Sequence, residues 1–387
     1  MTKKRPSKRV SRRDFIGMAS VAAGAASLGG LPSLAFAKAQ GAKKPMFKGQ
    51  TLRVFVYSGA WEKAFREEFV PRFEAMTGAR VVVDPGWWDS IPKLKASPKG
   101  HPAFDLVLTD GTQGYPAIKE GMFQKIDMTR IPNRLSLVPS VLNNWVYTDG
   151  YGITFPESAM TLAYNKNMLK FTPTSWADLL RDDVKGKVGL YNSFYMSLYT
   201  FACMKVAHEG KPGTAAREIE TNLNRVITFA KEHRDAIKYW WPTSTDMALN
   251  LVQRNTSIGN IHSSDILPAM AQKPELGAIV PDADRAFVQF MWVIPVGTQR
   301  KDLAEEAINF IFSEDMQTAF AVRGQATANL ASAKIAAAKN PFWKQIYPST
   351  TEQLAKVAYY PYDAYTKNWD VITKAWDESI LRKGHRS

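Results

Sequence analysis

The side chains that most often carry out chemistry are few and scattered in this sequence. The five histidines stand at positions 101, 208, 233, 262 and 385, and no HExxH or CxxC spacing gathers ligands for a transition metal. The single cysteine, Cys203, lies in the apolar run 198–204, which is typical of a buried, inert thiol. No GxSxG, GxGxxG or P-loop motif is present. These observations favour a binding protein over an enzyme, with a hydrolase that uses paired carboxylates as the alternative.

Short strands alternate with amphipathic helices after position 50. Residues 52–57 (LRVFVY) predict a strand, and residues 61, 65, 69, 73 and 76 form the buried stripe of a helix that ends at Gly78. A second strand at 80–84 completes a parallel βαβ unit, whose ligands lie beyond the carboxyl ends of the strands. Further strands are predicted at 104–109, 187–192, 257–261 and 287–294. About 350 residues of this pattern exceed one domain, so we expect an α/β fold with two lobes.

The first 37 residues have the pattern of an export signal. Residues 1–13 carry seven Lys or Arg and no acid, a weakly apolar stretch follows at 15–31, and Ala35-Phe36-Ala37 is a small-x-small cleavage pattern. SRRDFI at 11–16 resembles a twin-arginine signal, an address read by the Tat translocase in bacteria. A lone membrane helix is the alternative, but the stretch is rich in Gly and Ala. We expect signal peptidase to cut here and release a periplasmic protein.

The charge balance excludes some partners. The formal net charge is +14, and removal of the seven cations and one acid of the signal leaves +8. This charge is scattered, without the Lys/Arg runs interleaved with aromatic residues that indicate nucleic-acid binding. A moderately basic surface favours at most an anionic solute or an acidic docking partner. A single cysteine excludes an internal disulfide.

Several motifs, in order along the chain, resemble those of the periplasmic solute-binding proteins that serve ABC importers, in particular the spermidine/putrescine-binding group. They are FDLV (104–107), EGMFQKID (120–127), TLAYNK (161–166), TSWADL (174–179), KGK (185–187), EAINFI (306–311) and GQATANLA (324–331). The resemblance implies a periplasmic binding protein-like α/β fold of type II, with two lobes joined by a two-strand hinge near 153–158 and 285–290. Lobe 1 would comprise 50–156 and 288–330, and lobe 2 would comprise 157–287 and 331–387.

In that family the ligand contacts come from loops at the ends of strands. Carried over position by position, the resemblance implies ligand contacts at Tyr57, Ser58, Trp61, Asp110, Thr112, Asn192, Ser193, Tyr195, His262, Ser263, Gln289 and Phe290. Ordinary structural roles are the alternatives: Trp61 could pack in the core, Asp110 could cap the next helix, and His262 could be a hydrogen-bonded structural histidine. The pair Trp87-Trp88 could form a wall of the site or the edge of a lobe.

The sequence departs from the polyamine-binding pattern in its acids. Polyamine binders carry two acids in the loop that matches 192–196, another at Phe290, and a tryptophan at His262. An ammonium group needs carboxylates and aromatic faces to replace its lost water, and here only Asp110, with Glu157 or Asp265, remains. The lining therefore favours a smaller amine, an amino-acid-like zwitterion, or an aromatic or weakly anionic solute over spermidine.

The resemblance implies a binding protein that captures a small organic solute (polyamine-like, amine or amino-acid-like) by hinge closure and delivers it to a membrane permease. We expect a monomer without cofactor or metal. Ferric iron or an organophosphonate is the alternative cargo within the same superfamily. Tyr359-Tyr360 is the pair that suggests iron, because related ferric-binding proteins use adjacent tyrosines, although theirs lie near the position of 191–199.

Overall fold

The computed structural model describes residues 46–355 and 357–381, so the predicted signal at 1–37 lies outside the described residues. The strands are β1 Thr51–Tyr57, β2 Arg80–Gly86, β3 Leu106–Asp110, β4 Phe123–Gln124, β5 Gly152–Asn165, β6 Val188–Tyr191, β7 Ile237–Trp241, β8 Ile258–His262, β9 Leu276–Ile279, β10 Ala286–Pro295 and β11 Ala358–Tyr359.

The α-helices are α2 Ala60–Ala64, α3 Val70–Thr77, α4 Ser90–Lys95, α5 Gly111–Lys119, α6 Pro139–Leu142, α7 Trp145–Thr148, α8 Phe194–His208, α9 Ala215–His233, α10 Ser244–Val252, α11 Ser263–Gln272, α12 Lys301–Ile311, α13 Glu314–Val322, α14 Leu330–Lys339, α15 Pro341–Ile346, α16 Thr351–Ala355, α17 Tyr362–Lys367 and α18 Trp369–Ala375. Two π-helical turns, η1 Phe65–Phe69 and η7 Trp376–Ile380, continue α2 and α18. Short 3-10 helices are η2 Met128–Arg130, η3 Pro132–Ser136, η4 Trp176–Leu180, η5 Asp182–Val184 and η6 Arg234–Ala236.

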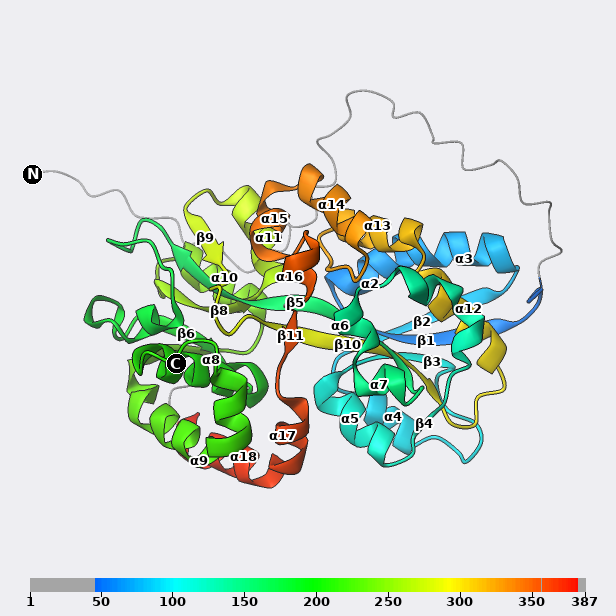
Figure 1. Cartoon of the computed structure of the whole chain (residues 1–387), viewed down its shortest axis with the longest axis horizontal. Coiled ribbons are helices and arrows are strands. Elements are labelled where there is room, and N and C mark those ends of the chain that lie inside the picture. The colour runs from blue at the N-terminus through cyan, green and yellow to red at the C-terminus, as the bar shows by residue number, and fades with distance from the viewer. Residues whose placement is uncertain (1–45, 356, 382–387) are drawn as a thin grey trace, which may run out of the picture.

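The strands form one curled sheet that runs through two lobes (Figure 1). Its order is β2-β1-β3-β10-β5-β8-β6-β7, with β4 and β11 added to β10 and β9 added to β5. We call the part built on β1–β4 the first lobe and the part built on β6–β9 the second lobe. Helices cover the sheet within each lobe, as the parallel pairs β1–β2, β1–β3, β6–β7 and β6–β8 require. The predicted α/β fold is confirmed.

Two long antiparallel strands, β5 and β10, connect the lobes. Their register runs from Phe287 opposite Ala159 to Val293 opposite Gly152. β10 also pairs with β3 of the first lobe, where Phe290 lies opposite Asp110. Beyond its contact with β10, β5 pairs with β8 and β9 of the second lobe. β5 includes the predicted crossing segment 153–158, and β10 includes all of the predicted segment 285–290 except its first residue, whereas the exact lobe boundaries stay a prediction.

The first βαβ unit forms as predicted, with one exception. β1 and β2 are parallel, and Phe65, Phe69 and Phe73 are buried and stack at centroid distances of 4.3 and 4.8 Å. Met76 was predicted to continue this buried stripe, but 43% of it is exposed. The reason is the π-helical turn at η1, which adds a residue to one turn and shifts the phase of the residues that follow.

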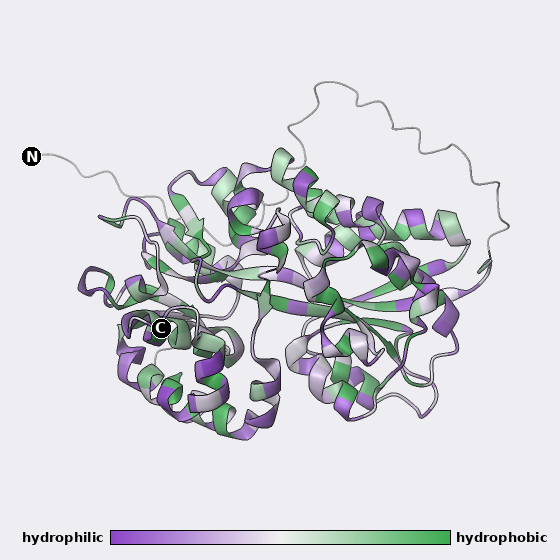
Figure 2. Cartoon of the chain, viewed as in Figure 1, coloured by the Kyte–Doolittle hydropathy of each residue, from purple (hydrophilic) through white to green (hydrophobic). Residues whose placement is uncertain are grey.

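Burial follows the layers of the fold. The hydropathy colouring is apolar along the central strands and polar on the outer helical surfaces (Figure 2). Every residue of β10 is buried, and so is every residue of β5 except Glu157. Cys203 is fully buried in α8, as predicted. Among the described residues, no helix is long and apolar enough to cross a membrane.

We predict that the close approach of β6 and β8 depends on glycine. A Cβ added at Gly259 would lie 1.8 Å from the carbonyl oxygen of Gly189, and backbone cannot move aside easily. Gly259→Ala should lower the free energy of unfolding by about 3 kcal/mol, measured by urea denaturation. Gly277→Ala is the matched control, because its Cβ would meet only the ring of Tyr164, which can shift. Equal losses in the two variants would contradict this explanation.

Candidate ligand-binding site

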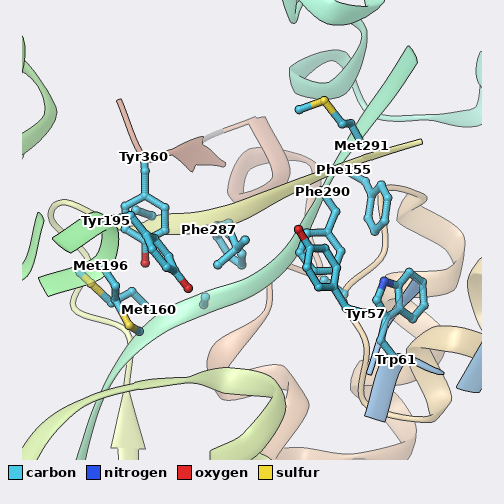
Figure 3. Close-up of a cluster of buried hydrophobic side chains, with 14 of the residues drawn as sticks. Tyr57, Trp61, Phe155, Met160, Tyr195, Met196, Phe287, Phe290, Met291 and Tyr360 are labelled. Carbon is cyan, nitrogen blue, oxygen red and sulfur yellow. The ribbon is translucent and has the colours of Figure 1, made fainter. Parts of the chain in front are cut away.

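Five parallel-sheet strands end at aromatic or ionisable residues. The last residues of β1, β3, β6, β7 and β8 are Tyr57, Asp110, Tyr191, Trp241 and His262. The carboxyl ends of parallel strands gather at one edge of a sheet, which is where α/β proteins bind ligands. Because β5 and β10 bring the two lobes together, the ends from both lobes lie on either side of the crossing strands (Figures 1 and 3).

On the side of the first lobe, Tyr57 contacts both an acid, Asp110, and an aromatic ring, Phe290. Its hydroxyl donates a short hydrogen bond to Oδ2 of Asp110, and its ring stacks on Phe290 with a centroid distance of 4.7 Å (Figure 3). The other carboxylate oxygen of Asp110 accepts from the backbone N–H groups of Thr112 at 2.7 Å and Gln113 at 3.3 Å. Asp110 therefore caps α5, and one carboxylate serves both the helix and Tyr57.

Burial dominates the electrostatics of this pair. Removal from water raises the pKa of Asp110, although the Tyr57 hydroxyl and the helix N–H groups oppose the rise. Burial, followed by the negative charge of Asp110, raises the pKa of Tyr57 well above its usual range. Tyr57 consequently keeps its proton and remains a donor at neutral pH.

On the side of the second lobe, Tyr195 and His262 form a neutral polar pair. The Tyr195 hydroxyl lies 3.1 Å from Nε2 of His262, and Tyr191 contacts the Tyr195 ring edge-on at 5.6 Å. Burial lowers the pKa of His262 to about 4, so the imidazole is uncharged at neutral pH. After burial, the charge of Asp110 also raises the pKa of Tyr191, to about 12. The acid of the first lobe thus acts electrostatically on a residue of the second.

A pair of acids lies where β5 meets α11. Ser264 donates its backbone N–H to Oγ of Ser158 at 3.3 Å, which places Glu157 next to the first turn of α11 and Asp265. Burial raises the pKa of Glu157 to about 8, with a contribution from Asp265, and raises that of Asp265 to about 6. Glu157 also contributes to the raised pKa of Tyr360. The pair is therefore within electrostatic range of the aromatic rings.

The side chains near the strand ends determine which kind of ligand could bind there. We use "interlobe cluster" for the following side chains: Tyr57, Asp110, Tyr191, Tyr195, His262, Phe290 and Tyr360. Within the chain that the structure describes, no lysine or arginine forms a hydrogen bond, ion pair or ring contact with them. Aromatic faces, a buried carboxylate and a neutral imidazole suit a cationic or neutral polar ligand better than an anion.

Comparison with known proteins decides the family. The family model described as bacterial extracellular solute-binding protein matches residues 68–346. The chain belongs to that family. The resemblance predicted from the sequence motifs is therefore confirmed.

Named relatives of this solute-binding protein are identical to it at about a quarter of the aligned residues. It is 24% identical over 298 residues to the spermidine/putrescine-binding periplasmic protein of Escherichia coli, covering 76% of this chain and 83% of that one. It is 25% identical over 299 residues to the gamma-aminobutyric acid-binding protein of Pseudomonas aeruginosa, covering 76% and 79%.

The fold is shared with solved structures of the same class. One is a spermidine/putrescine ABC transporter substrate-binding protein from Streptococcus pneumoniae, in complex with calcium and HEPES. The TM-score is 0.67 at 17% identity, and the match covers 85% of this chain and 100% of that one. At this identity the likeness establishes the fold of the solute-binding protein and leaves its ligand open.

Two of the predicted contact residues of the solute-binding protein have other partners. Trp61 packs among Phe155, Phe290 and Phe320 in the core. Ser263 is fully buried, accepts from the N–H of Ala159 at 2.8 Å and donates to the Tyr347 hydroxyl at 2.8 Å. These contacts favour structural roles for both, and their predicted ligand contacts stay untested.

The remaining predicted residues lie close to the strand ends. Ser58 and Asn192 are half-buried and donate backbone N–H groups to Gly86 and Trp241, while Ser193 precedes α8. Thr112 is buried in the first turn of α5. Gln289 is fully buried, its backbone N–H donates to the Tyr362 hydroxyl at 3.1 Å, and neither atom of its amide group has a hydrogen-bond partner among the described residues.

The C-terminal segment adds contacts that the sequence analysis did not assign. The Tyr360 ring meets Tyr195 at 5.7 Å and Tyr199 at 5.2 Å, and both Tyr195 and Tyr360 appear in Figure 3. Tyr365 donates its hydroxyl to the backbone carbonyl of Tyr195 at 2.8 Å. The run of tyrosines between 359 and 365 was the available signal, but its spacing alone does not show where the segment folds back.

The tyrosine pair does not assemble an iron site. Tyr359 lies near Thr154 and Tyr115, whereas Tyr360 packs against Tyr195 on the second lobe, so the two phenols have separate surroundings. Burial raises the pKa of both phenols, which disfavours the phenolate that iron requires. Within the described residues, no group of three or more His, Cys, Asp or Glu could hold a metal ion. The ferric alternative gains no support.

Removal of the Tyr57 hydroxyl should change the titration of Asp110. In Tyr57→Phe the carboxylate loses a donor, so its pKa should rise further and the free energy of unfolding should fall by about 1.5–3 kcal/mol. Carboxyl ¹³C NMR of the aspartates would measure the pKa. Tyr164→Phe, which removes a hydroxyl on β5, is the matched control and should leave the Asp110 titration unchanged. An unchanged pKa in Tyr57→Phe would refute the assigned interaction.

Glu157 should make the protein less stable as pH rises from 6.5 to 8. The native state keeps a proton up to a pKa of about 8, whereas the unfolded carboxyl releases it near 4.5, so stability falls as pH increases between these values. Above pH 6.5 neither His262 nor Asp265 contributes strongly. The slope is at most about 1.4 kcal/mol per pH unit.

Urea denaturation at several pH values would measure this slope. Glu157→Gln should remove it, because the amide does not titrate. Glu352→Gln, at an exposed position on α16, should retain the wild-type slope. If all three proteins show the same slope, the proton does not belong to Glu157.

Proposed function

We propose that this chain is the substrate-binding component of an ABC importer and that it captures a small organic amine. The observation that carries the proposal is the interlobe cluster, in which strand ends from both lobes present aromatic rings around the buried carboxylate of Asp110. The named relatives bind spermidine, putrescine or gamma-aminobutyric acid, which all contain at least one amino group. The chain would bind its solute and return it unchanged, without acting as an enzyme.

The distribution of acids narrows the solute class. Asp110 supplies one anionic position, and Glu157 with Asp265 supplies a second near Tyr360. An ammonium group bound at the second position would favour the ionised form of Glu157, so binding would release a proton. The predicted departure from polyamine binders still holds for residues 192–196, which carry no acid. A compact monoamine or diamine suits this small set of acids, and an organophosphonate lacks cationic partners here.

Capture would proceed by closure of the lobes about β5 and β10. A ligand that contacts Asp110 from the first lobe and Tyr195 from the second gains both sets of contacts only when the lobes are together. The two crossing strands are the connection at which such a rotation would occur, and the lobe boundaries near 156 and 288 follow from this proposal.

The cellular setting follows from the same proposal. The periplasmic names of relatives support a periplasmic location, and residues 1–37 would direct export by the Tat route before cleavage. The closed protein, acting as a monomer, would then deliver its solute to the membrane permease of the importer.

Calorimetry with purified protein tests the solute class. We expect putrescine or gamma-aminobutyric acid to bind, and glucose and methylphosphonate to give no heat. Asp110→Asn should weaken amine binding about 10- to 100-fold, because a charge-assisted contact is lost while asparagine still caps α5. Asp149→Asn, at an exposed site after α7, is the control and should bind normally. Binding of methylphosphonate alone, or of iron in native mass spectrometry, would overturn the proposal.

A further inference from the structure

Two adjacent tryptophans stand exposed beside the interlobe cluster. Trp87 and Trp88 follow β2 and precede α4, and they are 61% and 39% exposed. Large apolar side chains left in contact with water near a binding site are commonly functional, because burying them inside the same lobe would be more favourable for stability. From the sequence alone, this pair could form either a wall of the site or the edge of a lobe.

The two rings contact opposite lobes. Trp87 lies 5.8 Å from the ring of Tyr57, which belongs to the same lobe. Trp88 lies 6.2 Å from the ring of Tyr195, at the start of α8 in the second lobe. Two neighbouring residues of one loop therefore contact different lobes: Trp87 packs on its own lobe, and Trp88 reaches the second lobe.

The loop that carries them is held in place. The backbone N–H of Trp87 donates to Oδ1 of Asp89 at 2.9 Å, and Lys93 pairs with Asp89 at 2.9 Å and with Asp84 at 3.1 Å. A Cβ at Gly86 would come within 2.2 Å of the Asp89 carboxylate, so the turn closes tightly there. Trp88 therefore faces the second lobe from a turn that is already ordered. Contact between the lobes would cost little further conformational entropy in this turn.

We propose that Trp88 is a latch residue, which packs on Tyr195 when the lobes close and slows the release of the bound solute. The inference rests on the hinge closure proposed above. Tyr195 also contacts His262 and Tyr360, so the latch ends on the same side chain that organises the second-lobe half of the cluster. An aromatic contact made only in the closed state stabilises that state and lengthens residence, while association remains governed by encounter of the open lobes.

Single-molecule FRET without any solute tests the latch separately from the ligand. Cysteines introduced at exposed Lys63 on α2 and Lys231 on α9 would carry the dyes, since native Cys203 is buried. Trp88→Ala should raise the ratio of open to closed molecules about 3- to 10-fold, and Trp88→Phe should restore most of the difference. Trp87→Ala should leave this ratio unchanged, because its ring contacts only the first lobe.

Stopped-flow release of putrescine and of gamma-aminobutyric acid provides the second measurement. For whichever binds, Trp88→Ala should quicken dissociation by the same 3- to 10-fold factor and leave association within twofold of wild type. Leu135→Ala, at another exposed apolar position, should change neither rate. An unaltered FRET distribution in Trp88→Ala, or an equal shift in Trp87→Ala, would overturn the latch. Normal FRET shifts without binding of either amine would instead refute the proposed solute class.

Discussion

The paired strands β5 and β10 are the constraint on which the rest of the molecule depends. They are the strands through which the sheet passes from one lobe to the other, and they are buried along almost their entire length. Burial on both faces favours a largely apolar sequence, as in β10 (AFVQFMWVIP), whereas β5 also buries the polar residues Thr154, Ser158 and Thr161. Their pairing also fixes where β3 and β8 end, since each of these strands pairs with one crossing strand. The site is therefore assembled by sheet register rather than by flexible loops.

Burial shifts the pKa values of acids and bases around the interlobe cluster in opposite directions, for one physical reason. It raises the pKa of Glu157 and Asp265 and lowers that of His262, because each group is driven toward its uncharged form. Burial raises the pKa of Asp110 as well, although two backbone N–H groups and the Tyr57 hydroxyl oppose the rise. In each case a nearby cation would favour the ionised form of the buried acid.

How much could be predicted from the sequence depends on how local the signal is. The first strands and the strand at 287–294 follow from apolar runs, whereas the crossing segments and the candidate residues Tyr57, Asp110 and His262 follow from the family resemblance applied at strand ends. The structure joins Tyr57 to Asp110 by a hydrogen bond and pairs His262 with Tyr195, and the ligand contacts of these residues stay a prediction. Met76 was misplaced because a π-helical turn has no simple periodic signature. The contacts of Tyr360 and Tyr365 cannot be predicted from local sequence, because they form when the C-terminal segment returns to α8. Tyr195 and Tyr360 are roughly 165 positions apart in the chain, and such long-range contacts leave no local pattern.

The tyrosine run shows why residue type alone is a weak guide to chemistry. Adjacent tyrosines suggest a metal site when only the sequence is considered, yet alternation along an extended segment sends neighbouring side chains in opposite directions. Here β11 pairs with β10, so Tyr359 lies toward Thr154 and Tyr115 while Tyr360 lies toward Tyr195. For two tyrosines to bind the same ion, they would have to stand two residues apart on one extended segment or come from different strands. The C-terminal tyrosines therefore link the crossing strands to the second lobe and add an aromatic ring, Tyr360, to the interlobe cluster.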